Sequence, residues 1–216
     1  MDEYPPLEVK VWGDYACFTR PEMKVERVSY AVPTASALRG LLEAILWKPQ
    51  FRWDVREAWV LQPIRFASLM RNEVKSKASL RSVQGWARDG GGYEAAEDRT
   101  QRHSLVLRDV AYLIRAQVQV VEGCDAQPAK FRDQFRRRVQ RGQCFARPYL
   151  GCREFSASFA QPEGSEEPIA ENLDLGRMLL DLDYAEDGDG RGTPRFFEAR
   201  MEQGVIRYPP MALGEV

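Results

Sequence analysis

Between residues 130 and 153 the chain carries a dense run of basic side chains opposed by a single acid, Asp133. Arginine suits phosphate recognition because its planar guanidinium donates paired hydrogen bonds and stacks on bases, whereas lysine offers a point charge. Tyr149 and Gly151 follow, an aromatic ring and a residue that allows close approach of a nucleic-acid backbone. The stretch predicts nucleic-acid binding, and a merely solvated helix face is the alternative. The basic residues are Lys130, Arg132, Arg136, Arg137, Arg138, Arg141, Arg147 and Arg153.

Ligands for a catalytic metal are scarce. The four cysteines are scattered without C-x-x-C spacing, and His103 is the single histidine. A zinc site needs three or four such ligands, so composition excludes most catalytic zinc sites, and we expect neither a metal nor a cofactor. The cysteines are interpreted as small, partly buried apolar residues.

Composition describes an ordinary globular protein of 216 residues with a net charge of -1. No apolar run approaches the roughly 18 residues of a membrane span, and the acidic, proline-containing start lacks the features of a secretory signal. We therefore expect a cytoplasmic protein with no membrane partner. Charge is segregated along the chain, since residues 163–189 are strongly acidic, and partners respond to such local fields rather than to the total.

Hydrophobic periodicity predicts the elements that hold the basic stretch. Alternation predicts strands over 7–13, 105–120 and 155–159, and a short apolar segment predicts another over 58–61. A leucine-rich run after Thr34, a plausible N-cap, predicts a first helix that Pro49 ends. Pro128 begins a second helix that ends near Gly142.

The second helix should have two distinct stripes. Phe131, Phe135 and Val139 recur every four residues and should face the sheet. The neighbouring stripe then projects its cationic ends together; it contains Lys130, Gln134, Arg137 and Arg141.

The order strand, helix, strand, strand, helix, strand predicts an α+β fold of the ferredoxin-like (RRM-like) split βαβ type. Residues 1–162 would form this domain, with a basic loop or hairpin inserted at about 65–104. Residues 163–216 would add a small C-terminal antiparallel β subdomain, with a turn at 187–190 and a hairpin around Gly204. The inserted segment carries a second basic cluster, and we expect the two cationic segments to meet across the sheet and form a groove for single-stranded or hairpin RNA. This cluster includes Lys75, Lys77, Arg99, Arg102 and His103.

Several short strings resemble one known family when taken in order from about Leu7 through Phe159. They are Trp12-Gly13-Asp14-Tyr15-Ala16-Cys17-Phe18-Thr19, Ser29-Tyr30-Ala31-Val32-Pro33-Thr34, Trp47-Lys48-Pro49, Arg108-Asp109-Val110-Ala111-Tyr112 and Tyr149-Leu150-Gly151-Cys152-Arg153-Glu154. Together they resemble the CRISPR-associated Cascade subunit of subtype I-C, the Cas5 family of Dvulg type, a repeat-processing RAMP endoribonuclease.

The resemblance implies a protein that binds the CRISPR repeat hairpin, cuts the precursor transcript without metal through the RNA 2′-hydroxyl, and stays on the 5′ handle. Its partners would be the repeat RNA and other Cascade subunits of subtype I-C, with DNA as an open further ligand. The family pattern has a tyrosine near the end of the first helix and a lysine-histidine pair opening the second. Here Leu46 and Phe131 stand at the tyrosine and histidine positions, and Lys130 matches the lysine.

The resemblance therefore transfers one catalytic candidate, Lys130, to stabilise charge or donate a proton. His103 is the natural substitute acid or base because histidine titrates nearest neutrality, and Tyr149 is a third candidate; an incidental loop histidine and a packing tyrosine are the alternatives. A non-catalytic subunit that caps the RNA handle is the second reading, and an enzyme acting on small molecules the third. The expected RNA-binding residues are Arg99, Arg102, Arg137, Arg141, Arg147, Arg153 and Lys48.

Overall fold

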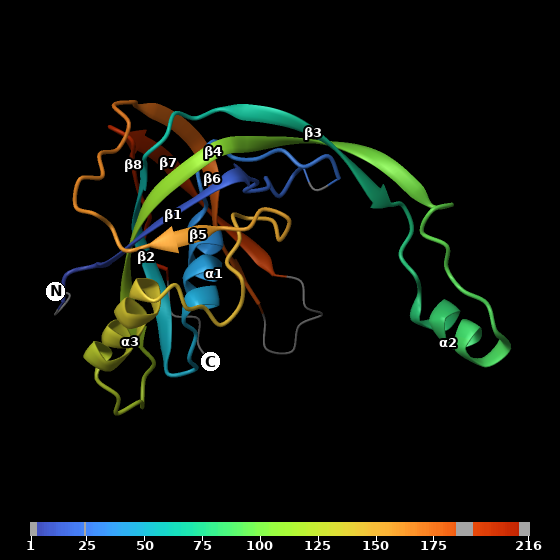
Figure 1. Ribbon diagram of the computed structural model, residues 1–216, viewed down its shortest axis with the longest axis horizontal. Helices are drawn as coiled ribbons and strands as arrows, with labels where there is room; N and C mark the ends of the chain where they lie inside the picture. The colour runs from blue at the N-terminus through green and yellow to red at the C-terminus, as the bar shows by residue number, and fades with distance from the viewer. Residues whose placement is uncertain (1–3, 24, 185–191, 212–216) are drawn as a thin grey trace.

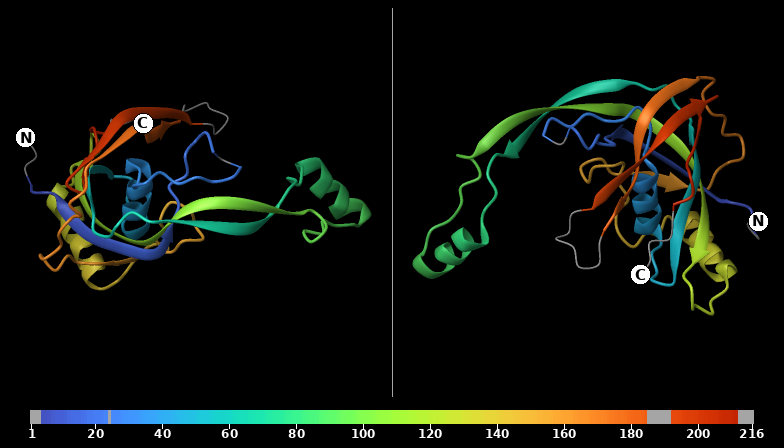
Figure 2. Two further views of the ribbon diagram at one scale, coloured as in Figure 1. Left: turned by 90° about the horizontal axis from the view of Figure 1, so that it is seen from above. Right: turned by 180° about the vertical axis from the view of Figure 1, so that it is seen from behind.

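The computed structural model describes residues 4–23, 25–184 and 192–211, and one long arm projects from the body of the protein (Figure 1). The body is an α+β structure whose antiparallel sheet curls around α1, Ala35–Ile45 (Figure 2). The predicted turn at 187–190 lies outside the described residues. None of the helices among the described residues is long and apolar enough to cross a bilayer.

Within the described residues, the strands form one eight-stranded sheet in the order β5-β1-β4-β2-β8-β7-β6, with β3 paired to β4 off this path. The C-terminal strands belong to the same sheet because β8 pairs with β2. The strand bounds are β1 Leu7–Ala16, β2 Phe51–Val60, β3 Phe66–Val74, β4 Arg99–Val120, β5 Ser158–Ala160, β6 Leu173–Asp183, β7 Thr193–Glu202 and β8 Val205–Arg207.

The first helix confirms its sequence signals. Thr34 is the N-cap, and its side chain accepts a hydrogen bond from the backbone N–H of Ala37. Leucines at the predicted spacing turn inward and are buried. Arg39 forms a paired guanidinium–carboxylate contact with Asp181 of β6, whose Nη2–Oδ1 distance is 2.7 Å. The helix is thereby fixed inside the curl of the sheet.

The predicted strands are present but differ in length. The segment at 58–61 is the end of the longer strand β2. The earlier part of β2 contains the buried residues Trp53 and Val55, but a register shift between Val55 and Glu57 interrupts its alternation. The predicted strand over 155–159 is reduced to β5, which pairs with β1 at the edge of the sheet. The predicted strand over 105–120 extends back to Arg99.

The segment expected as a basic loop or hairpin is an ordered arm. β3 and the first half of β4 pair from Phe66↔Leu107 to Val74↔Arg99, and α2, Leu80–Asp89, lies at the tip (Figure 1). The sequence did not predict α2, because its apolar side chains pack on no core: neither β3 nor α2 contains a buried residue. β4 is irregular at Asp109, which has φ +53°, and beyond it the strand still pairs with β1 at Arg108 and Leu107 before it enters the arm.

Candidate nucleic-acid interface

The second predicted helix is α3, Pro128–Gln140, and its inward stripe is confirmed. Phe131 packs against Phe51 with ring centroids 4.8 Å apart, and Phe135 packs against Trp53 at 4.6 Å. These contacts fix the rotation of α3, so the opposite stripe must face solvent. The aromatic ring at position 131 is therefore part of the core.

One arginine of the basic stretch belongs to the core as well. Arg132 is 2% exposed, and its guanidinium donates to Gln117 Oε1 at 3.0 Å and to the carbonyl oxygen of Pro5 at 2.5 Å. Tyr4 lies over the same group, 5.1 Å from ring centroid to Cζ. Arg132 thus ties the N-terminal segment to β4 and is not available to a phosphate.

The outward face of α3 is cationic as predicted. Lys130, Arg137 and Arg141 are exposed, and none of them forms an ion pair with another described residue. Arg136 is partly neutralised by Asp133, one turn earlier, at 3.2 Å. This unpaired stripe can attract a polyanion along the length of the helix.

The carboxyl end of α1 meets the end of α3. Arg138 donates from Nη1 to the carbonyl oxygen of Ile45 at 2.5 Å, so a cation satisfies an orphan carbonyl of the first helix. Lys48 is half-buried and lies three residues after Ile45, the last residue of α1. Lys48 therefore lies three residues along the chain from the carbonyl group of α1 that Arg138 contacts.

The glycine turn predicted after α3 is built around Gly151. Its φ of +82° is left-handed, and a Cβ there would overlap the carbonyl oxygen of Cys17, so only glycine fits. Tyr149 is half-buried and lines a cavity of about 410 Å³ beside the amino end of α1 together with Thr34 and Ser36. Arg147 and Arg153 flank this turn and are exposed.

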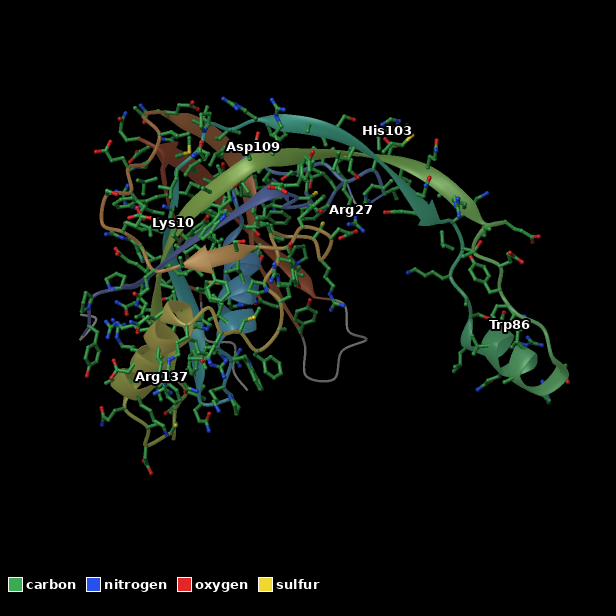
Figure 3. All side chains as sticks on the ribbon, in the orientation of Figure 1. Lys10, Arg27, Trp86, His103, Asp109 and Arg137 are labelled. Carbon is green, nitrogen blue, oxygen red and sulfur yellow. The ribbon has the colours of Figure 1, made fainter. Side chains whose placement is uncertain are left out.

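The second basic cluster does not meet α3. His103 lies on β4 opposite Met70, exposed on the arm, whereas Arg137 lies at the far side of the body (Figure 3). The expected single groove between the two clusters is therefore wrong. The strand pairing of β3 with β4 carries the second cluster away from the sheet face that the helices cover.

Arg102 and Arg99 of the arm differ in their surroundings. Arg102 contacts Glu73 at 3.3 Å, while Arg99 is exposed at the end of β4. Glu73 also accepts from Arg71 at 2.5 Å, and Arg71 reaches Glu154 of the body at 3.0 Å. These contacts hold the base of the arm against the loop that follows the glycine turn.

Cys152 lies beside Glu154, among the ion pairs at the base of the arm. The Arg27 guanidinium is 3.3 Å from Cys152 Sγ and 3.2 Å from Glu154. Hydrogen bonding with Cys17, together with Thr19 and Arg27, lowers the pKa of Cys152 to about 6, although burial opposes the shift. Sequence reasoning missed this cluster because Cys17, Thr19 and Arg27 lie more than a hundred residues before Cys152 and Glu154. Among the described residues no three potential metal ligands of the His, Cys, Asp and Glu types come together.

The geometry defines an α+β protein with an exposed cationic helix and an extended arm. Residues 6–209 match the family model described as CRISPR-associated protein (Cas_Cas5), of the Cas5d type. The chain belongs to this Cas5d family.

Two curated relatives match nearly the whole chain. The chain is 44% identical to a CRISPR pre-crRNA endoribonuclease Cas5d of Mannheimia succiniciproducens, over 97% of each sequence. It is 45% identical to the protein of the same name from Thermus thermophilus, covering 94% of this chain and 91% of that one. A crystal structure of a CRISPR-associated protein superposes with a TM-score of 0.68 at 24% identity, over 98% of this chain and 95% of that one, which supports the fold alone.

Proposed function

We propose that this protein is an endoribonuclease that binds the repeat hairpin of precursor CRISPR RNA and cleaves it. One observation carries the proposal: near-complete coverage at 44–45% identity by two relatives named as pre-crRNA endoribonucleases. The exposed cations of α3 supply a surface of the right sign for such a substrate. In this proposal the protein acts in the cytoplasm, stays on the 5′ handle of its product and joins other Cascade subunits of subtype I-C, with DNA as a further ligand.

The proposed cleavage uses the RNA 2′-hydroxyl as nucleophile and needs no metal. Its attack on the adjacent phosphate forms a 2′,3′-cyclic phosphate and expels the 5′-oxygen, so one group must accept a proton, another must donate one, and cations must stabilise the extra negative charge. Lys130 is suited to the last role because it is exposed on the cationic face of α3. Holding the 2′-hydroxyl in line with the leaving oxygen contributes a large share of the rate by itself.

Tyr149 and His103 are the other two proposed catalytic candidates, and because they occupy different places they cannot both act with Lys130 at one scissile phosphate. Tyr149 borders the cavity beside the amino end of α1, and His103 lies on the arm. They would therefore contact different segments of one RNA. The proposed RNA-binding residues remain Lys48, Arg137, Arg141, Arg147 and Arg153 on the body, and Arg99 and Arg102 on the arm.

We also propose that the body is a ferredoxin-like split βαβ domain. The order β5-β1-β4-β2, all antiparallel, with α1 after β1 and α3 after β4, supports this reading. In the same proposal residues 1–162 form the RNA-binding domain, and 163–216 are a C-terminal β addition to its sheet.

Cleavage of a cognate repeat hairpin in excess chelator tests the proposed chemistry. A matched RNA with a single 2′-deoxy nucleotide at the scissile position should bind equally and resist cleavage, because it lacks the nucleophile. Cleavage of the deoxy substrate at the normal rate would rule out this mechanism. Lys130→Ala should slow cleavage by more than it weakens binding, and Arg200→Ala, an exposed arginine on β7, is the control.

A second function is favoured by two buried side chains. Leu46 is 0% exposed and Phe131 is 3% exposed. By the family resemblance of the sequence, these two residues stand where the family pattern has a tyrosine and a histidine. Two core residues in place of two proton-transfer groups support a subunit that caps the RNA handle without cutting. Tight binding of repeat RNA with no cleavage during prolonged incubation would establish this alternative.

A further inference from the structure

Two aromatic side chains stand exposed beside the carboxyl end of α1. Phe145 is 77% exposed, the largest fraction among the large hydrophobic side chains described, and Trp47 is 54% exposed. Rings of this size normally bury most of their area in a core or an interface. Neither ring belongs to the hydrophobic core, which contains Trp53, Phe131 and Phe135.

The backbone that carries these rings is held firmly. The N–H groups of Phe145 and Ala146 both donate to the carbonyl oxygen of Ala44, at 2.8 Å and 3.0 Å. The indole N–H of Trp53 donates to the carbonyl oxygen of Leu46 at 2.9 Å, next to Trp47. With the bond from Arg138 to Ile45, these contacts satisfy the last carbonyls of α1 and join the two ring-bearing segments. The rings are thus displayed on a fixed base.

Three cations belong to the segments that carry the exposed rings. Arg138 donates a hydrogen bond to the carboxyl end of α1, Lys48 follows Trp47 in the chain, and Arg141 lies four residues before Phe145. Within the described part of the chain, none of these three cations forms an ion pair with a carboxylate. Exposed aromatic faces within a cationic surface are the combination by which proteins bind unpaired nucleotides, because each base can stack while its phosphate is neutralised.

We propose that Trp47 and Phe145 form a stacking platform for unpaired nucleotides of the bound RNA. The inference rests on the proposed function, and it adds that the protein distinguishes single-stranded from paired RNA at the end of α1. Duplex RNA hides its base faces within its own stack, so it can use the cations of α3 but not the two rings. A purely apolar protein partner is a poorer fit, because docking it here would remove three cations from water without a counter-charge.

Comparing the binding of two RNAs distinguishes stacking on the two rings from the electrostatic attraction of α3. Fluorescence anisotropy would compare a single-stranded oligonucleotide with a blunt duplex of the same length. Trp47→Ala and Phe145→Ala should each weaken single-strand binding roughly 5- to 150-fold, the range expected from one lost stack, and change duplex binding less than about twofold. Trp47→Phe, which keeps a stacking ring, should restore most of the affinity.

A matched control exists on another part of the molecule. Trp12 is 39% exposed on β1, on the sheet face opposite α1 and α3 as judged by its alternation with buried Val11. Trp12→Ala should leave both RNAs bound as in the unmodified protein. Melting temperatures of all variants should agree within a few degrees, since the replaced rings are exposed.

Cys144 gives an independent readout in the unmutated chain. Its thiol is exposed and precedes Phe145 directly. Single-stranded RNA on the platform should slow alkylation of Cys144 by iodoacetamide, measured peptide by peptide, whereas the duplex should leave the rate unchanged. Equal protection by both RNAs contradicts the proposal.

The outcomes distinguish the platform from the enzyme. If the unmodified protein binds and cuts precursor RNA but the ring variants lose no single-strand affinity, or lose duplex affinity equally, the platform is wrong and the endoribonuclease stands. If the unmodified protein binds the cognate repeat hairpin but neither of these RNAs, the platform alone is wrong. If it binds none of the three, the proposed function and the platform fall together.

Discussion

Removing the exposed cations of α3 should change the salt dependence of RNA binding by a predictable amount. The perturbation is a triple variant, Lys130→Ala, Arg137→Ala and Arg141→Ala. All three side chains are exposed, and none of them is engaged by a carboxylate within the described part of the chain. Each is therefore available to displace one counterion from the RNA.

Each phosphate contact contributes about 0.7 to the slope of log K against log salt for a single strand. Loss of three contacts should therefore lower the slope by about 2. Between roughly 50 and 200 mM salt, the affinity gap between the unmodified protein and the triple variant should narrow about 20-fold. Filter binding or anisotropy across a salt series measures both slopes directly.

Arg132 is the internal control for this prediction. It lies in the same helix and carries the same charge, but it is buried and bonded to Gln117 and Pro5. Arg132→Met should therefore leave the slope unchanged. A slope that falls for Arg132→Met, or that stays constant in the triple variant, would refute the division of α3 into a structural and a phosphate-facing side.

Further predictions concern stability and reactivity. Arg132→Ala should lower the free energy of unfolding by roughly 2–4 kcal/mol, because buried acceptors lose their donor and a void remains; unchanged denaturant midpoints would contradict its core role. Gly151→Ala should cost about 3 kcal/mol or more, since alanine would adopt a left-handed backbone and overlap the Cys17 carbonyl; a stable, fully active variant would show that the turn tolerates a side chain. In a Cys144→Ser background, Cys152 should be thiolate above its lowered pKa, so its alkylation rate should rise with a midpoint near pH 6; a midpoint near about 8.5, as in free cysteine, would contradict the effect of its neighbours.

The elements with strong local signals could be predicted from sequence. α1 has an N-cap and a leucine stripe, and α3 has an initial proline and the Phe131 stripe, so both were identified with their buried faces. The family strings also identified the family correctly. Periodicity succeeded where one face of an element meets the core, because burial then dictates residue type at each turn.

The remaining features depend on long-range contacts. The burial of Arg132 requires Tyr4, Pro5 and Gln117 to converge, and no local pattern distinguishes it from its exposed neighbours. Placement of His103 required knowing that β3 pairs with β4 beyond the body. The exposure of Phe145 likewise follows from hydrogen bonds to Ala44, a hundred residues earlier.

The arm is fastened to the body by backbone pairing, and its outer portion supports no core. The N–H of Lys75 donates to the carbonyl oxygen of Asp98 at 2.9 Å, at the end of the antiparallel pairing of β3 with β4. A short turn could therefore replace residues 76–97 and leave the sheet intact. The folding of the body therefore does not constrain the length or the sequence of residues 76–97. Selection can change the binding surface of this tip without loss of the stability of the protein.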